Sequence, residues 1–170
     1  MYLRGIVLGC LLVSACSFGA QIVTDESLVS IDMLPVCNGD AQVKLVYTNV
    51  SEGKLLVDPS LIESAMFDPF SAGVDLYTSD FEEVPLKIMG ATNSHGKLER
   101  YAVFGPGESV EHLIDFDEIL TGSIDKTRNA IVSFGFTSQA IKENGDIVII
   151  DVSSPFLLKD HVIAPSCWQE

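Results

Sequence analysis

Short segments in which apolar and polar residues alternate dominate the chain from residue 37 onward, and turn residues separate them. The clearest segment is 41–49, in which Val43, Leu45 and Tyr47 fall on one face of an extended strand. No stretch repeats its apolar residues with the longer period of a helix. About eight short strands with frequent turns are typical of an all-β protein, so we expect an antiparallel β-sandwich with Greek-key connections.

Turn residues set the limits of the remaining strands. Residues 54–57 are expected to return beside the first strand, and Asn144-Gly145 is expected to close a hairpin between the last two. The expected strands are 41–49, 54–57, 73–77, 84–88, 98–104, 110–116, 130–136 and 146–152, with single helical turns at 61–67 and 117–120.

The first thirteen residues have the composition of an export signal. Arg4 is followed by an uncharged stretch from Gly5 to Val13, which is too short for a membrane-spanning helix of about 20 residues. A positive residue, a short apolar run and small residues after it predict a secretory signal peptide.

The segment Val13-Ser14-Ala15-Cys16 resembles the lipobox of bacterial lipoproteins. The resemblance implies cleavage before Cys16, acylation of its thiol and a membrane contact through that lipid. Ser17, rather than Asp, follows the cysteine, which by the family's sorting rule implies the outer membrane. The alternative is ordinary cleavage at the same place, with Cys16 left as a free thiol or a disulfide partner. The expected organisation is a signal peptide at 1–15, a lipidated tether at 16–36 that could contain one early strand at 28–31, and a sandwich domain at 37–170.

The chain is strongly acidic. Its 10 basic and 24 acidic residues give a net charge of −14. Removal of residues 1–15 would take away only Arg4 among the charges, leaving 9 − 24 = −15. Such a charge repels nucleic acid and anionic lipid, so we expect no nucleic-acid partner.

Two cysteines remain once the signal peptide and the lipidated position are set aside. Cys37 and Cys167 lie near the two ends of the expected domain, and in an oxidising compartment such a pair usually forms a disulfide. Closing a loop of about 130 residues would stabilise the fold by roughly 4–5 kcal/mol. A reactive or metal-binding pair is the alternative, although the chain has no Cys-x-x-Cys motif.

Residues of the types that bind metal ions are scattered in the sequence. The histidines His95, His112 and His161 include no closely spaced pair of the kind that zinc sites use. We expect His112 to lie half-exposed on a strand and the other two to lie in loops. Weak calcium candidates occur in two acidic turns, but the spacing of an EF-hand loop is missing, which favours solvated strand edges. The candidates are Asp80, Glu82 and Glu83 in one turn and Asp115, Asp117 and Glu118 in the other.

No catalytic motif is present in the sequence. Gly-x-Ser-x-Gly is absent, and we predict no catalytic residue and no cofactor. Four aromatic residues, Tyr77, Phe81, Tyr101 and Phe104, fall near turns or strand ends and could form a ligand patch. Strand alternation instead favours the core for most of them.

Several segments together resemble a known domain. They are Tyr47-Thr48-Asn49, the run from Val84 to Gly90, the run from Arg100 to Val110 that contains Gly105-Pro106-Gly107-Glu108, and the run from Asp115 to Leu120. Their order over residues 40–152 is similar to the immunoglobulin-like, non-catalytic domain that precedes the protease domain in some deuterolysin-type zinc metallopeptidases. The family's His-Glu-x-x-His motif is absent, so the resemblance implies an immunoglobulin-like fold and no catalytic role.

These features predict a non-enzymatic lipoprotein on the periplasmic face of the outer membrane or on the cell surface. Its expected role is that of an accessory module that binds another envelope or secreted protein through loops or an open sheet edge. A small periplasmic hydrolase or metal-binding protein is an alternative, and a protease inhibitor is a further one. The fold alone does not decide among these classes.

Overall fold

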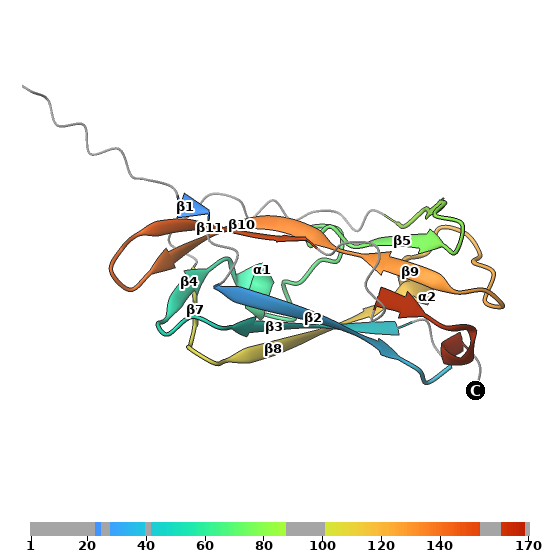
Figure 1. The fold of residues 1–170 in the computed structure, drawn as a ribbon, viewed down its shortest axis with the longest axis horizontal. Coiled ribbons are helices and arrows are strands. Elements are labelled where there is room, and N and C mark those ends of the chain that lie inside the picture. Colours follow the sequence, from blue (N-terminus) through green and yellow to red (C-terminus); the bar gives the residue numbers. More distant parts are fainter. Residues whose placement is uncertain (1–22, 25–27, 40–41, 88–100, 154–160, 169–170) are drawn as a thin grey trace, which may run out of the picture.

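The structure, a computed structural model, describes residues 23–24, 28–39, 42–87, 101–153 and 161–168. Within these ranges nearly all regular structure is β, and the predicted all-β, antiparallel sandwich is confirmed (Figure 1). No helix in these ranges is long and apolar enough to cross a membrane. The strands are β1 (Val23–Thr24), β2 (Val29–Val36), β3 (Gln42–Asn49), β4 (Leu55–Val57), β5 (Asp75–Thr78), β6 (Glu83–Val84), β7 (Ala102–Phe104), β8 (Ser109–Asp115), β9 (Ala130–Ser133), β10 (Gly135–Lys142), β11 (Ile147–Ser153) and β12 (Val162–Ile163). The helices are α1 (Pro59–Ile62), α2 (Phe116–Ile119) and a 3₁₀ helix at Pro165–Trp168.

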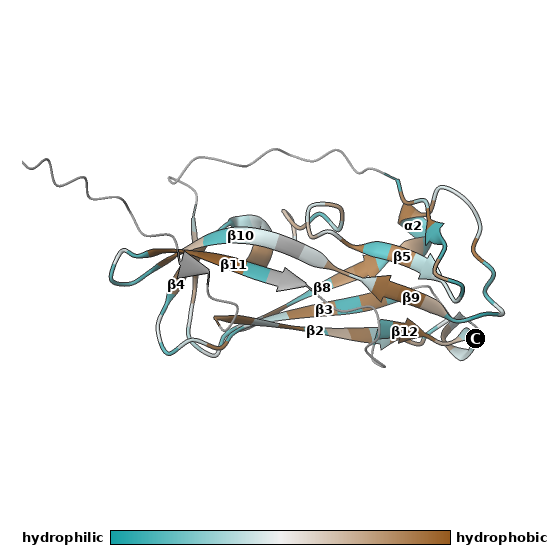
Figure 2. Cartoon of the chain, turned by 45° about the horizontal axis from the view of Figure 1, so that its top comes forward, coloured by the Kyte–Doolittle hydropathy of each residue, from teal (hydrophilic) through white to brown (hydrophobic). Residues whose placement is uncertain are grey.

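One layer is a three-stranded antiparallel sheet in the order β2-β3-β8. In its central strand, Val43, Leu45 and Tyr47 are buried while the residues between them are half-buried, which confirms the alternation that predicted this strand. Figure 2 shows that such changes between hydrophobic and hydrophilic residues recur along the strands of the molecule. The inward side of β3 therefore forms the floor of the core.

The second layer is made of two sheets that are joined end to end. A five-stranded sheet has the order β1-β11-β10-β4-β7, and a four-stranded sheet has the order β12-β9-β5-β6. The chain passes from β9 to β10 through Phe134 alone, so the single strand expected at 130–136 is in fact divided between two sheets. The hairpin between β10 and β11 is confirmed, and Gly145 in its turn has a φ of 88°.

The two layers are linked by crossing connections of the Greek-key type. β3 and β8 are neighbours in one layer, while β4 and β7 are neighbours in the other. The prediction that residues 54–57 return beside β3 is wrong, because β4 pairs with β10 and β7. The buried amide of Asn49 explains the crossing: it donates hydrogen bonds to the carbonyl oxygens of Phe104 (2.8 Å) and Gly53 (3.0 Å).

The sandwich begins earlier in the chain than expected. The expected tether extended to residue 36, but β2 pairs with β3 along its whole length and buries Val29 and Met33. Asp32 and Pro35 obscure the alternation in this strand. Both are compatible with the edge of a sheet, where an exposed charge and a residue without an N–H are tolerated.

A disulfide closes the sandwich. Cys37 directly follows β2, and Cys167 lies in the 3₁₀ helix after β12, and the two are joined by the predicted bond with a Cα–Cα distance of 3.9 Å. The bond connects the three-stranded sheet to a strand of the other layer. Parts of the strands expected at 84–88 and 98–104 lie outside the described residues.

Candidate functional site

His112 is the most unusual side chain of the described core. It is only 2% exposed, so the expectation of a half-exposed face residue is wrong. Its ring stacks on Phe67 with centroids 4.1 Å apart and meets Tyr47 edge-on at 5.4 Å. Because a carbonyl only accepts, His112 Nε2 donates the 2.9 Å hydrogen bond to the carbonyl oxygen of Leu61. Burial lowers the pKa of His112 below its ordinary value, so the ring is held neutral.

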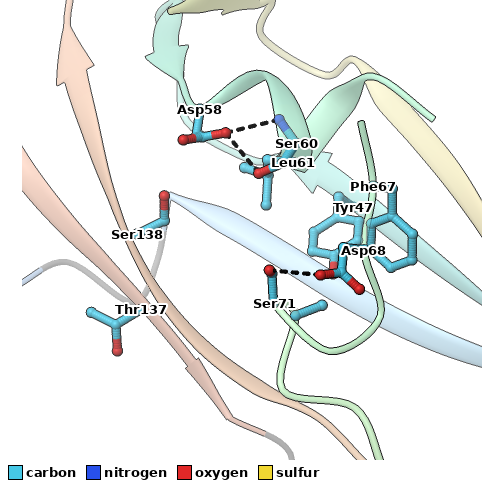
Figure 3. Close-up of a pocket in the computed structure, with 10 residues that line it drawn as sticks. Tyr47, Asp58, Ser60, Leu61, Phe67, Asp68, Ser71, Thr137 and Ser138 are labelled. Carbon is cyan, nitrogen blue, oxygen red and sulfur yellow. Dashed lines mark hydrogen bonds between the residues drawn. The ribbon is translucent and has the colours of Figure 1, made fainter. Parts of the chain in front are cut away.

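A small pocket opens next to this cluster, between α1, the connection that follows it and β10. Its volume is about 60 Å³, enough for a few water molecules. Figure 3 shows side chains from both layers pointing toward it. The pocket is lined by Tyr47, Asp58, Ser60, Leu61, Phe67, Asp68, Ser71, Ala72, Thr137 and Ser138.

The two carboxylates of this pocket are engaged by their own turns. Asp58 accepts from the backbone N–H of Ser60 at 2.9 Å and from its hydroxyl at 2.7 Å, capping α1. Asp68 accepts from the Ser71 hydroxyl at 3.0 Å in the next turn. Burial also raises the pKa of the Tyr47 phenol, which keeps it neutral. The lining can hydrogen-bond a small polar molecule, but among the described residues it pairs no serine with a histidine base.

The acidic turns are stabilised by cations of the chain itself. Asp80 forms an ion pair with Arg128 at 2.6 Å, and Asp117 forms one with Lys126 at 3.0 Å. Asp115 accepts from the backbone N–H of Asp117 at the start of α2. Within the described ranges, no three histidine, cysteine or acidic side chains gather into a group that could hold a metal ion. The structure therefore does not bring the calcium candidates Asp80, Glu82, Glu83, Asp115, Asp117 and Glu118 together.

The other histidines and the aromatic residues are dispersed. His161, which was expected in a loop, lies directly before β12 and is buried beside Phe134 at a ring-centroid distance of 5.4 Å; His95 lies outside the described residues. Strand alternation predicted that most of the four aromatic residues lie in the core. This prediction is wrong, because only one of the four is buried. Phe104 is buried, Phe81 is exposed in the β5–β6 turn at a φ of 63°, and Tyr77 and Tyr101 are half-buried.

A wider hollow lies between the β3–β4 loop and the β10–β11 hairpin. Its volume is about 470 Å³, and side chains of both charges line it, including Lys54 and Glu143. This mixture of charges favours neither an anionic nor a cationic ligand.

The outer side of the three-stranded sheet forms an exposed surface, which we call the β2–β3–β8 face. Its residues are Asp32, Leu34, Lys44, Val46, Glu111 and Leu113. Strand register places Leu34 and Leu113 on either side of Lys44, and they are 51% and 56% exposed. Lys44 forms an ion pair with Glu111 at 2.9 Å. Aliphatic side chains thus surround an ordered pair of charges.

Comparisons with known proteins do not place the chain in a family. No family model and no curated protein matches it. One similar solved structure is the X-ray structure of Northeast Structural Genomics Consortium target SoR45. It is 10% identical, with 80% of this chain and 92% of that chain covered, at a TM-score of 0.38. A similarity at this level says nothing of function.

Proposed function

We propose that the chain is a lipid-anchored, non-catalytic interaction module of the bacterial outer membrane. The observation that carries the proposal is the β2–β3–β8 face, where Leu34 and Leu113 are both more than half exposed in register across three strands. A single exposed leucine is ordinary on a protein surface. Two of them on one level of a sheet, with Val46 on the next level, make a broader apolar surface of the kind that partners cover.

The charges on the same face favour a protein partner. Interfaces combine an apolar centre with charged groups that orient the partner and exclude wrong ones. Here the Lys44–Glu111 pair supplies that polar element, and Asp32 lies in register on the level of Glu111. A flat sheet offers these groups without a loop having to become ordered, which limits the entropic cost of binding.

The anchor is proposed from the lipobox at Val13-Ser14-Ala15-Cys16. The Cys37–Cys167 disulfide supports export, since such bonds persist in oxidising compartments. A lipid on Cys16 would hold the module at the membrane, where partners in the same envelope are locally concentrated.

Crosslinking in intact cells tests the interaction. A photoreactive residue at Leu113 should give one discrete crosslinked product, and Leu34→Lys in the same chain should reduce that product at least about fivefold. The matched control is a photoreactive residue at Phe70, which is 52% exposed in the connection between α1 and β5. Equal products from both positions, or none from Leu113 in folded and membrane-bound protein, would exclude this face as the interaction site.

A separate experiment tests the anchor. Intact-mass analysis of the membrane fraction should show the loss of residues 1–15 and acyl mass on Cys16. Cys16→Ser should leave the precursor uncleaved or release the domain from the membrane. A wild-type chain that begins at Cys16 and carries no acyl group would rule out lipidation and favour ordinary cleavage.

A further inference from the structure

A second apolar surface lies on the other layer, at the end where the chain enters the sandwich. Val103 of β7 pairs with Leu56 of β4, Leu56 pairs with Ile141 of β10, and Ile141 pairs with Ile147 of β11. These four residues occupy one level across four neighbouring strands, and we call them the aliphatic row.

The aliphatic row points away from the core. Its sequence neighbours Leu55, Phe104, Ala140 and Val148 are all buried, so strand alternation turns the row outward. Val103 is 56% exposed and Leu56 is 37% exposed, while the two isoleucines are half-buried. With strands about 4.8 Å apart, the row is roughly 14 Å wide.

The row itself carries no charge, and two charged residues, Lys54 and Glu143, lie two positions from Leu56 and Ile141 on the side of the β10–β11 hairpin, where they line the wider hollow. In the other direction the sheet carries little charge. On the next level along β10 and β11, Gln139 pairs with Ile149, and the first outward charge on these strands is Asp151 one level farther. On the β2–β3–β8 face, by contrast, Asp32 and Lys44 place charges on successive levels. The two outer faces therefore differ in chemistry, and the aliphatic row is suited to an apolar partner.

The position of β1 points to the occupant. Val23 opens β1 and pairs with Val148, which directly follows Ile147 of the row. Cys16 precedes Val23 by seven positions, and seven steps of a fully extended chain span at most about 25 Å. A lipid on Cys16 would therefore keep the row close to the bilayer surface. A second copy of the chain is a weaker candidate, because two molecules that each carry a net charge of −15 after removal of residues 1–15 repel one another.

We propose that the aliphatic row rests on the bilayer into which the acylated Cys16 is inserted, so that the five-stranded sheet faces the lipid. This placement rests on the proposed lipid anchor. The contact is apolar and superficial, comparable in depth to that of an amphipathic segment at the headgroup boundary. It needs little intrinsic affinity because the anchor makes it intramolecular. Since the chain is acidic, the contact does not require anionic lipid.

Fluorescence quenching by the lipid tests this placement with a matched pair of positions. Val103 and Leu113 are both 56% exposed but lie on different layers, so Val103→Trp and Leu113→Trp report on the two faces equally well. The full acylated chain is reconstituted in phosphatidylcholine vesicles with and without brominated acyl chains. The native Trp168 is common to both variants, and the wild-type signal corrects for it.

We expect Val103→Trp to be quenched at least about twofold more strongly than Leu113→Trp, with a blue-shifted emission. Ile147→Trp serves as a second reporter on the row if Val103→Trp fails to fold, and it should behave in the same way. Replacing part of the phosphatidylcholine by phosphatidylglycerol should not strengthen the quenching.

Other results of the quenching experiment would show whether the placement, the anchor or the choice of partner is wrong. Equal quenching at the two positions, in protein that floats with the vesicles, would overturn the placement and leave the anchor intact. Wild-type protein that does not float would overturn the anchor and this placement with it. An emission at position 103 that shifts with protein density but is not quenched by bromine would show that the row binds a second copy instead.

Discussion

His112 is buried because it occupies the inward phase of β8, between the inward residues Val110 and Ile114. Its ring acts as a flat aromatic packing unit against Phe67, and its single hydrogen bond connects β8 to Leu61 in α1. Nδ1 has no hydrogen-bond partner in the described part of the chain. A second proton on this ring would therefore place a charge in the core without compensation.

The stability of the protein should consequently depend on pH through His112. Its pKa in the folded chain lies below the ordinary value of 6.5, so the unfolded chain takes up a proton first as the pH falls. The contribution of the neutral His112 ring to stability is fully present above about pH 6.5 and is lost progressively as the pH falls below that value. We expect the free energy of unfolding in urea to fall between pH 7.5 and pH 5.5, and to fall less in His112→Phe, which cannot be protonated.

The comparison between wild type and His112→Phe isolates this residue. His95 and His161 are present in both proteins, so their titration contributes equally to both. An identical loss of stability in the two proteins would show that His112 titrates normally. The predicted quantity is the difference in pH dependence, since the substitution also removes the hydrogen bond to Leu61.

Sequence patterns gave partial information at this scale. The phase of β8 could have been inferred from Val110 and Ile114, but the polarity of histidine argued for the surface and led to the wrong expectation. The role of Asn49 could not have been predicted. Its partners Phe104 and Gly53 become neighbours only when the two layers assemble, and a buried amide has no sequence pattern of its own.

At the scale of elements, the junction of the two sheets in the second layer depends on a close backbone approach. Gly73 has a φ of 61°, and a Cβ at this position would overlap the carbonyl oxygen of Gly135 at the start of β10. The same two residues share a backbone hydrogen bond, in which Gly135 N donates to the carbonyl oxygen of Gly73 at 3.2 Å. The contact holds the chain before β5 against the point where β9 gives way to β10.

Gly73→Ala should therefore be strongly destabilising. The added methyl group meets backbone rather than a flexible side chain, and an L-residue is strained at this φ. We expect a loss of about 3 kcal/mol or more, measured by urea unfolding. Gly122→Ala is the control, because nothing lies within 4 Å of its added Cβ, and it should change stability by less than about 1 kcal/mol. Similar effects of the two substitutions would show that the Gly73–Gly135 approach is not a tight constraint.

Local signals predicted elements well and their partners poorly. The strand at 42–49 and the Asn144-Gly145 hairpin were predictable because both depend on adjacent residues. The strands that pair with β4 were not predictable. A turn followed by a short apolar segment has the same sequence pattern whether the chain returns to the same sheet or crosses to the other layer. The sequence marks the division of β9 from β10 only by Gly135, and the residue that this glycine contacts, Gly73, lies far away in the sequence.

On the scale of the whole molecule, the two outer faces and the two ends have different properties. Figure 1 places β1 and the C-terminal end of the described chain at opposite ends of the longest axis. The aliphatic row lies at the β1 end, close to the proposed anchor. The charged and apolar β2–β3–β8 face belongs to the other layer. In the proposed arrangement one sheet meets the bilayer and the other remains available to a partner.

The disulfide lies at the end of the molecule away from β1, and this position leads to the last prediction. Cys37 ends the three-stranded sheet, and Cys167 follows β12, which pairs only with β9 in the described part of the second layer. The bond spans 130 residues, so it restricts the unfolded chain strongly as well as joining the layers. Substituting both cysteines by alanine should lower the free energy of unfolding by about 2–5 kcal/mol, measured in urea.

The same variant separates stability from membrane placement. Because the aliphatic row is built from β4, β7, β10 and β11, its register does not depend on the disulfide end. The double-alanine variant should therefore retain the difference in bromine quenching between positions 103 and 113 at temperatures where it is folded.

Oxidised peptide mapping of the wild type should recover one fragment that links the two cysteines. Free alkylation of both thiols in protein isolated from cells without reductant would show that the bond is not formed, and the pair would then have to be considered as reactive thiols.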